Sequence, residues 1–337
     1  GRYGLERQYE DILTRGDEDS FVNYFAEIFL SVGQSFFSVP TPKREGNIVT
    51  TIEPTVQAAL EKELDIINGD WSPDLIGGII MDPKTGGIVA MGVLPSFNPG
   101  EKQENLSLLT NPLVERVYEM GSIFKPLTMA AGIDSGAITP ATRYFDKGFL
   151  VLNTARIENF DGKGRGDVDM QEVLNKSLNT GAACVASKMG HDTFRQYMLN
   201  YGLGEKTGID LPDEIPGLVK NLDSTRDIEY ATVSFGQGVA VTPIEITRAL
   251  ATLGNGGVLV TPHLVTEVKY EGGLTKTITP KPPRQVLKPE TSADITRMLV
   301  NVVDKSLAGG TVSLPHYRVA AKTGTAQIAN PAGGGYY

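Results

Sequence analysis

Strand-like runs lie toward both ends of this chain, and a stretch that is mostly helix-like, from about Pro112 to Leu253, separates them. The strand-like runs are Val49–Ile52, Leu75–Met81, Gly87–Val93, Gly257–Val268 and Tyr317–Gln327. This order predicts an α+β fold, an α/β sandwich in which two distant parts of the chain build one antiparallel sheet. Helices would flank that sheet, and the middle of the chain would form an inserted helical subdomain.

A hairpin is the most local of these predictions. Asp82–Gly86 joins two of the runs with Asp, Pro and Gly, the residues that tight turns prefer. Just before the hairpin, Pro54–Asn68 has the spacing of an amphipathic helix that begins near Thr51. We therefore expect the compact part of the chain to open at about Ile48 with a strand, a helix and a hairpin.

The composition is that of a globular protein and excludes some partners. The 337 residues carry a net charge of −9, with 40% hydrophobic and 21% charged residues. This charge argues against a protein that binds nucleic acid through a basic face. The single cysteine, Cys184, allows no internal disulfide. No run reaches the ~20 apolar residues that a membrane span requires.

The first 47 residues differ in residue pattern from the rest. Gly1–Thr14 predicts a short helical lead-in, and Phe21–Phe37 is aromatic-rich with a roughly helical period. The second segment has two interpretations: packing against another domain or subunit, or contact with a membrane surface, although it has no Lys or Arg to meet anionic lipids. Pro40–Asn47 predicts a linker.

The first chemical motif is Ser-x-x-Lys at Ser122–Lys125, followed by Pro126. Residues three apart on a helix share a face, so the Ser122 and Lys125 side chains can meet. Because a proline inside a helix clashes with the carbonyl four residues earlier, Pro126 favours a place for Ser122 at the helix N-terminus. A serine hydroxyl is a weak nucleophile, and a lysine whose pKa is lowered can activate it as a base.

Two further motifs follow in order. Ser177-Leu178-Asn179 lies between a helical pattern and a run of small residues, so a loop is expected there; its hydroxyl and amide could relay a proton and hold a substrate amide. Lys322–Thr325, Lys-Thr-Gly-Thr, lies within a strand-like run. Its glycine, Gly324, indicates a close approach of another backbone or a ligand, and the hydroxyls of Thr323 and Thr325 could bind a carboxylate.

A second Lys-Thr-Gly, at Lys206–Gly208, serves as a control. It lies in the turn-like stretch Leu203–Pro212, so we exclude it as the catalytic lysine. The three histidines, His191, His263 and His316, fall outside all the motifs, which disfavours a Ser-His-Asp triad and a His-based metal site.

The ordered set of Ser-x-x-Lys, Ser-x-Asn and Lys-Thr-Gly is typical of β-lactamases and penicillin-binding proteins. From Ile48 onward the chain resembles the class B penicillin-binding proteins, and we see no glycosyltransferase module of the class A kind. The segments that carry the resemblance are Gly4–Leu13, Thr51–Leu60, Val114–Pro126, Gly202–Pro212 and Ser234–Glu245.

The resemblance implies two regions. Residues 1–47 would be a remnant of a pedestal domain with a linker. Residues 48–337 would be the transpeptidase domain in the penicillin-binding fold, without the last strands and the C-terminal helix of that fold. The resemblance also implies a single-pass anchor in the cell membrane of the full-length protein, with the catalytic domain outside the cytoplasm.

The implied activity is peptidoglycan D,D-transpeptidation. Ser122 would attack the penultimate D-Ala carbonyl of a stem peptide, Lys125 would take its proton, and Ser177 would pass a proton to the leaving amine. Asn179 and Lys322 would position and polarise the substrate. The substrate-binding residues would be Thr323, Gly324 and Thr325, and the backbone amides of Ser122 and Thr325 would form an oxyanion hole.

The implied partners are stem peptides ending in D-Ala-D-Ala, β-lactams as covalent inhibitors, and a SEDS-type glycosyltransferase in the same membrane. No metal or organic cofactor and no nucleic acid is implied. Two rival interpretations stay open: a β-lactamase or β-lactam sensor of the same fold, and a non-catalytic scaffold that binds cell-wall peptides or division proteins.

Overall fold

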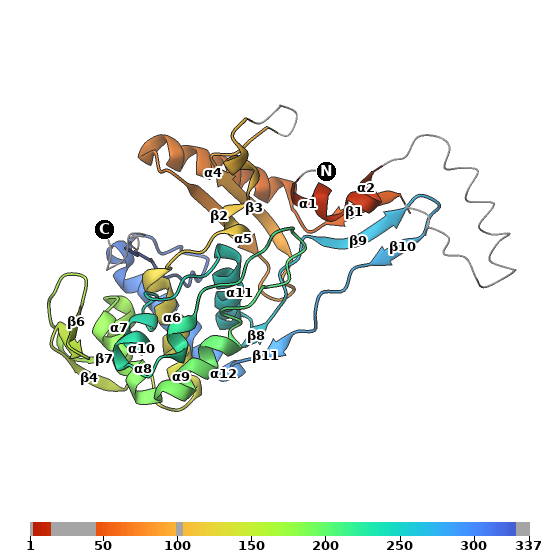
Figure 1. The fold of residues 1–337 in the computed structure, drawn as a ribbon. Coiled ribbons are helices and arrows are strands. Elements are labelled where there is room, and N and C mark those ends of the chain that lie inside the picture. Colours follow the sequence, from red (N-terminus) through yellow and green to blue (C-terminus); the bar gives the residue numbers. More distant parts are fainter. Residues whose placement is uncertain (1–2, 15–44, 99–103, 328–337) are drawn as a thin grey trace, which may run out of the picture.

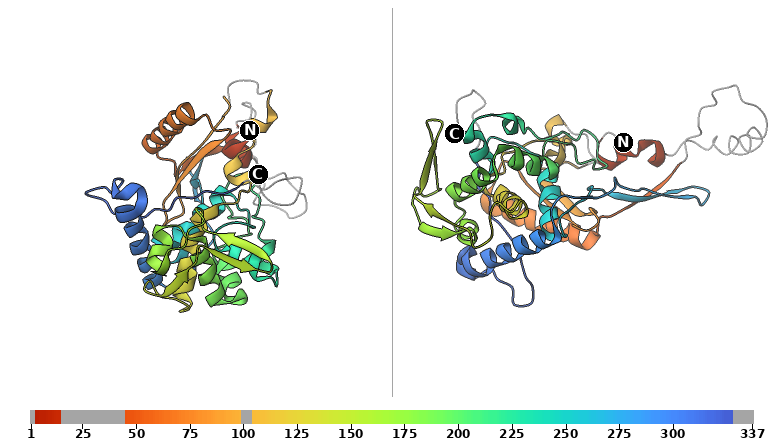
Figure 2. Two further views of the ribbon diagram at one scale, coloured as in Figure 1. Left: turned by 90° about the vertical axis from the view of Figure 1, so that its left-hand side faces the viewer. Right: turned by 90° about the horizontal axis from the view of Figure 1, so that it is seen from below.

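The computed structural model describes residues 3–14, 45–98 and 104–327. A helical body carries an arm made of strands, and the helical lead-in lies beside the base of that arm (Figure 1). Seen from below, the arm projects well beyond the body (Figure 2, right). The aromatic segment Phe21–Phe37 lies outside the described residues.

The arm confirms that distant parts of the chain share a sheet. Strand β1 (Gly46–Thr50) pairs antiparallel with β9 (Val265–Tyr270), more than 200 residues later, and β9 pairs with β10 (Thr275–Thr277). A second short pair joins β8 (Val258–Leu259) to β11 (Arg284–Gln285). The predicted strand Gly257–Val268 is therefore two strands, and the stretch between them makes only an isolated bridge, from His263 to Gly87.

The predicted hairpin is confirmed. Strands β2 (Ile76–Met81) and β3 (Ile88–Leu94) pair antiparallel. In the turn, the Asp82 carboxylate accepts hydrogen bonds from Lys84 N (2.9 Å) and Thr85 Oγ1 (2.9 Å), so the turn closes on its own side chains.

The predicted amphipathic helix is also confirmed. Helix α4 (Pro54–Trp71) begins with a proline in its first turn and packs on the hairpin. Gly78 permits the close contact, because a Cβ there would lie 2.7 Å from the Leu60 side chain.

Helix α6 (Lys125–Asp134) lies at the centre of the helical body and is buried at every position except Ile133. A helix that is buried on all sides must be surrounded, and other helices supply that cover (Figure 1). The described helices of the body and its margin are α5 (Pro112–Glu115), α7 (Met170–Asn175), α8 (Asn179–Met189), α9 (His191–Asn200), α10 (Asp227–Val233), α11 (Pro243–Gly254) and α12 (Pro289–Asn301).

The helix-like interpretation of the whole middle of the chain was partly wrong. Residues 143–169 form two antiparallel pairs, β4 (Arg143–Asp146) with β7 (Gly166–Asp169) and β5 (Phe149–Leu152) with β6 (Ala155–Glu158). These strands have four residues each, too few for their alternation to stand out from the surrounding helical patterns.

The strand predicted at Tyr317–Gln327 was wrong as well. The described part of this segment has no strand assignment beyond an isolated bridge between Leu314 and Tyr317. A strand requires the N–H and C=O groups of a neighbour, and Lys322–Thr325 lies against the turn that carries Ser122 rather than along a strand edge. The prediction of one sheet is therefore confirmed only for the pairing of β1 with β9.

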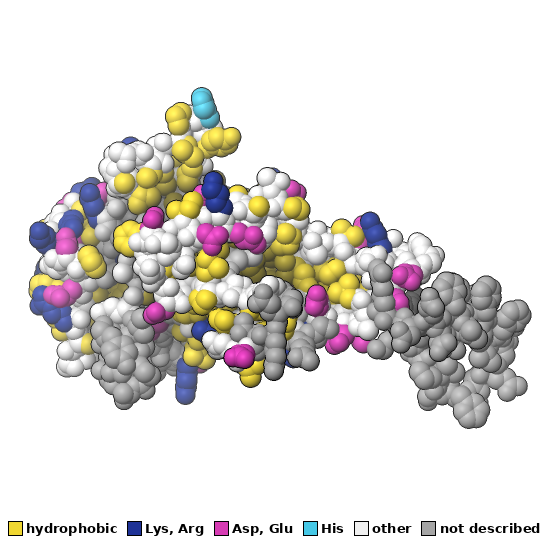
Figure 3. Space-filling view, turned by 90° about the horizontal axis from the view of Figure 1, so that it is seen from above, with side chains coloured by type: hydrophobic (Ala, Val, Ile, Leu, Met, Phe, Trp, Pro, Cys, Tyr) yellow, Lys and Arg dark blue, Asp and Glu magenta, His cyan; other side chains and the backbone are white. Residues whose placement is uncertain are grey.

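Viewed from above, Asp and Glu side chains lie along the middle of the molecule, and several Lys and Arg side chains lie at the end farthest from the arm (Figure 3). The basic side chains therefore form no continuous surface on this face. Within the described ranges, no helix is both long and apolar enough to cross a bilayer.

Candidate active site

Ser122 lies where a tight turn leads into the central helix. The 3-10 turn η2 (Gly121–Phe124) continues directly into α6, and Pro126 stands in the first turn of α6. A proline is tolerated in the first turn of an α-helix because the N–H that it lacks would have no partner within that helix. The predicted place of Ser122 at the helix N-terminus is confirmed.

The Lys125 ammonium group makes three contacts within the site. Its Nζ lies 2.8 Å from Ser122 Oγ, 2.7 Å from the Ser177 carbonyl oxygen and 3.0 Å from Ser177 Oγ. Lys125 is only 1% exposed. The Ser-x-x-Lys pair and the serine of the second motif therefore meet at one buried amine.

Burial is the main cause that lowers the pKa of Lys125 from 10.5 to about 6, and the nearby charge of Lys322 acts in the same direction. A charged amine loses its hydration in a buried site, so the neutral form is favoured. At neutral pH the amine is then mostly unprotonated. Lys125 can thus accept the proton of Ser122.

Lys322 approaches Ser177 from a segment that lies 145 residues later in the chain. Its Nζ donates to Ser177 Oγ at 2.9 Å and to the carbonyl oxygen of Thr323 at 2.9 Å. Burial lowers the pKa of Lys322 to about 8. Ser177 Oγ thus accepts from two lysines, and its own hydrogen is left to donate to a third group, as a proton relay requires.

Glycines allow the third motif to approach the nucleophile. A Cβ at Gly324 would lie 2.7 Å from Ile123 Cγ2 and 3.2 Å from the Met120 carbonyl oxygen. Gly121 has φ of +56°, and a Cβ there would lie 2.2 Å from the Thr325 carbonyl oxygen. Only glycine fits at such distances, so the close approach expected of Gly324 is what the structure has.

The remaining predicted residues are placed as follows. Thr323, Gly324 and Thr325 are exposed at the edge of the site. Asn179 is the first residue of α8, and its Nδ2 donates to the Glu158 carbonyl oxygen at 2.8 Å. Its amide thus faces the β5–β6 hairpin, and the roles of these four residues in substrate binding stay predictions.

The segment Ser234–Gly238 lies behind the nucleophile, within the stretch Ser234–Glu245 that carries part of the family resemblance. Gly121 N donates to the Gly236 carbonyl oxygen (3.0 Å), and Thr128 Oγ1 on α6 donates to the Ser234 carbonyl oxygen (2.8 Å). A Cβ at Gly236 would lie 2.2 Å from the Gly121 carbonyl oxygen. The Gly-x-Gly at Gly236–Gly238 was the signal that could have revealed this contact.

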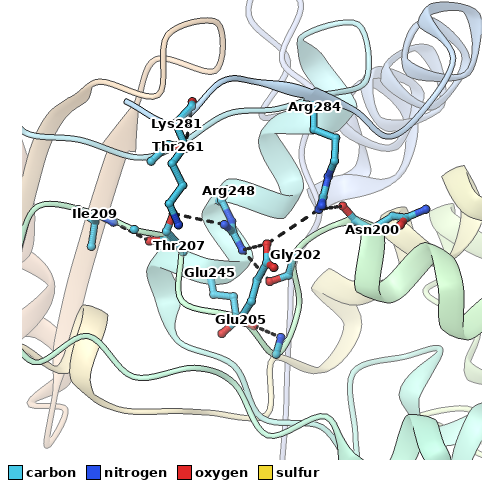
Figure 4. Close-up of polar contacts among 12 residues, drawn as sticks. Asn200, Gly202, Glu205, Thr207, Ile209, Glu245, Arg248, Thr261, Lys281 and Arg284 are labelled. Carbon is cyan, nitrogen blue, oxygen red and sulfur yellow. Dashed lines mark hydrogen bonds and ion pairs between the residues drawn. The ribbon is translucent and has the colours of Figure 1, made fainter. Parts of the chain in front are cut away.

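The second Lys-Thr-Gly is a structural turn, as expected. Thr207 N (2.7 Å) and Gly208 N (3.0 Å) donate to the buried carboxylate of Glu214. In the same region Arg248, also buried, donates to the carbonyl oxygen of Gly202 (2.6 Å) and contacts Glu205 (Figure 4). This network packs α11 against the turn and includes none of the three site motifs.

The histidines take no part in the site. His191 Nε2 lies 2.9 Å from Asp227 Oδ1, and His263 Nδ1 lies 3.1 Å from the Thr261 carbonyl oxygen. In the part of the chain that the structure describes, no group of three or more His, Cys, Asp or Glu could hold a metal ion.

The fold and the site define a class of proteins in which a serine hydroxyl at a helix N-terminus lies against a buried lysine amine. A family model described as the penicillin binding protein transpeptidase domain matches residues 76–337. The chain belongs to this family, and it has the mixed α+β transpeptidase fold.

Individual relatives support the same family assignment. Stage V sporulation protein D of Bacillus subtilis is 33% identical over 334 residues, 97% of this chain and 51% of that protein. Peptidoglycan D,D-transpeptidase MrdA of Acinetobacter baumannii is 29% identical over 365 residues, 100% of this chain and 52% of that protein. The chain thus spans about half the length of the curated relatives that it matches.

Among solved structures, penicillin binding protein 3 of Mycobacterium tuberculosis complexed with aztreonam is similar with a TM-score of 0.81. It is 25% identical, and the match covers 87% of this chain and 67% of that one.

Proposed function

We propose that the protein is a peptidoglycan D,D-transpeptidase that forms an acyl-enzyme at Ser122. The observation that carries this proposal is the contact of 2.8 Å between Ser122 Oγ and a Lys125 amine whose pKa is lowered to about 6. A neutral amine at that distance is a general base in hydrogen-bond reach of its proton.

In the first half-reaction, Ser122 Oγ attacks the penultimate D-Ala carbonyl carbon while its proton passes to Lys125 Nζ. The backbone amides of Ser122 and Thr325 are the proposed donors to the oxyanion. Collapse of the intermediate breaks the peptide bond, and the Ser177 hydroxyl supplies a proton to the leaving D-Ala amine. The proton on Lys125 replaces it through the 3.0 Å contact.

The substrate carboxylate would lie against Thr323 and Thr325, next to the positive charge of Lys322, and Asn179 would hold the peptide amide. In the second half-reaction, an amine of another stem peptide attacks the acyl-enzyme, and the same groups move protons in the reverse direction. A β-lactam ring would acylate Ser122 in the first step, as a mimic of D-Ala-D-Ala.

The wider setting is also proposed. The resemblance to class B proteins supports a single-pass anchor in the cell membrane, a catalytic domain outside the cytoplasm and a SEDS-type glycosyltransferase as partner. It also supports an assignment of residues 1–47 as a pedestal remnant and linker, and of residues 48–337 as the transpeptidase domain.

A labelled penicillin tests the proposal. We expect one covalent label per molecule on the protein, none on Ser122→Ala, and normal labelling of Ser135→Ala, an exposed serine at the end of the same helix. Intact mass measured over time then separates the transpeptidase from a β-lactamase and from a scaffold. A lasting adduct agrees with a transpeptidase, rapid loss of the adduct would indicate a β-lactamase, and a folded protein without any adduct would indicate a scaffold.

A further inference from the structure

Helix α8 begins beside Ser177 without a cap of its own. Its N-cap residue is Leu178, whose side chain can accept no hydrogen bond. The first N–H groups of a helix need acceptors, and polar side chains normally supply them. Here the acceptor comes from outside, since Thr180 N donates to Asn159 Oδ1 at 3.3 Å.

The Asp146 carboxylate is the centre of this external cap. It is 1% exposed, at the end of β4, and Thr180 Oγ1 donates to its Oδ1 at 2.8 Å. Asn159 Nδ2 donates to both of its oxygens, at 3.1 and 2.9 Å. The backbone N–H groups of Gly148 (2.9 Å) and Arg165 (3.0 Å) complete the set.

These contacts fix the β5–β6 hairpin to the start of α8. A buried carboxylate is stable only if hydrogen bonds replace its lost hydration, and here both oxygens have donors. Its negative charge also lies at the positive end of the α8 dipole. The Asn179 amide adds a third link, to the Glu158 carbonyl oxygen.

The same helix start fixes Ser177. Ser177 has φ of +53°, an unfavourable value for a residue with a side chain, so its surroundings must hold it there. In that conformation its carbonyl oxygen and its hydroxyl both face Lys125 Nζ, at 2.7 and 3.0 Å. Any shift of residues 178–180 would therefore move both acceptors of the lysine.

We infer that Asp146 is a positioning residue for acylation: through Asn159 and Thr180 it holds the start of α8, and thereby sets Ser177 against Lys125. Asp146 itself touches none of the reacting groups. This inference rests on the proposed function and adds to it a residue that lies outside the three motifs.

Two pairs of variants test it. Asp146→Asn keeps the shape but turns an NH2 group toward N–H or O–H donors, whichever way the amide lies. Its control is Asp167→Asn, the same change at an exposed aspartate of the neighbouring strand β7, which pairs with Arg143. Thr180→Val removes only the hydroxyl from the network. Its control, Thr180→Ser, keeps that hydroxyl.

The readout is the acylation of folded protein by a fluorescent penicillin, resolved into a binding constant and a rate constant for acylation. We expect Asp146→Asn and Thr180→Val to lower the acylation rate constant by about tenfold or more, with little change in binding. Asp167→Asn and Thr180→Ser should stay within about threefold of the unchanged protein. If Asp146→Asn does not fold, the Thr180 pair decides.

Amide hydrogen exchange at residues 177–181 supplies a readout that does not depend on activity. Faster exchange in Thr180→Val than in Thr180→Ser supports the inference. If the unchanged protein is acylated and folded Thr180→Val is acylated equally fast, this inference fails alone. If the unchanged protein is not acylated, the proposed function fails, and equal exchange in the two variants would then overturn the inference as well.

Discussion

Two lysines hold one serine between them at the centre of the site. Lys125 reaches Ser177 Oγ at 3.0 Å and Lys322 reaches it at 2.9 Å, yet the two amines differ in pKa because their burial differs. Lys125, with a pKa of about 6, is mostly neutral at pH 7, whereas Lys322, with a pKa of about 8, is mostly charged. Groups whose environments separate their pKa values are suited to opposite roles in proton transfer.

The pH profile of the acylation rate should therefore be bell-shaped. Below about pH 6 Lys125 is protonated and cannot take the Ser122 proton, and above about pH 8 Lys322 loses the charge that would hold the substrate carboxylate. The second-order rate constant for a penicillin, measured across this range, should rise through the first value and fall through the second. A rate that stays high well below pH 6 would contradict Lys125 as the base.

The low pKa of Lys125 also costs stability. In the unfolded chain this lysine is charged at pH 7, so unfolding takes up a proton, and stability from this group rises with pH between about 6 and 10.5. Lys125→Met should abolish acylation and raise the free energy of unfolding by about 1–3 kcal/mol at pH 7, since burial of an amine is replaced by burial of a thioether.

Denaturant unfolding at pH 7 measures this change, with Lys62→Met on exposed α4 as the control, expected within about 0.5 kcal/mol of the unchanged protein. A large loss of stability in Lys125→Met would mean that the hydrogen bonds of the amine outweigh its desolvation.

At the scale of elements, local chemistry was predictable from the sequence, whereas the neighbours of a strand-like segment were predictable only in part. The turn at Asp82–Gly86 closes on its own side chains, so the β2–β3 hairpin could be predicted. The position of Pro126 likewise predicted correctly that Ser122 lies at the helix N-terminus. The residues around Lys322 have strand-like character, but a strand is a property of two segments, and this one meets the η2 turn instead.

The role that we infer for Asp146 could not be predicted from the sequence for a related reason. In the sequence it stands directly before Lys147 and Gly148, where an aspartate usually marks an exposed turn. Its burial depends on Thr180, which is 34 residues away. Nothing in the spacing of the two residues indicates that they touch.

Gly324→Ala tests whether the close approach of the third motif matters for reaction. The new methyl group would meet Ile123 Cγ2 at 2.7 Å and should push Lys322–Thr325 away from the nucleophile. We expect acylation to be about tenfold slower or more with nearly unchanged melting temperature, because the segment is exposed and belongs to no strand. Gly254→Ala, with nothing within 4 Å of the new group, should change neither quantity.

At the scale of the whole molecule, one aspartate joins the lead-in to the arm. Asp210 accepts hydrogen bonds from Leu264 N (2.6 Å) and Val265 N (2.9 Å) where β9 begins, and from the hydroxyl of Tyr9 on the lead-in (2.9 Å). Arg7 pairs with Asp213 nearby. The helices α1 (Gly4–Gln8) and α2 (Glu10–Leu13) are thereby fixed to the body.

The Tyr9 hydroxyl and the Asp210 carboxylate should contribute differently to the free energy of unfolding. Tyr9→Phe removes one hydrogen bond and should cost about 1 kcal/mol of stability, whereas Asp210→Ala leaves two backbone N–H groups without their acceptor and should cost about 2–3 kcal/mol. Thermal unfolding measures both. Neither variant should alter acylation of the folded protein, and a loss of acylation would mean that the joint is coupled to the site.

The pairing of β1 with β9 also has a consequence for how the chain reaches its native state. During synthesis β1 emerges more than 200 residues before its partner, and the closure of so long a loop is slow. Until β9 is available, the N–H and C=O groups of β1 remain open to other chains. The arm should thus be the last part to form, and aggregation during refolding should begin there, while the body around α6 is already compact.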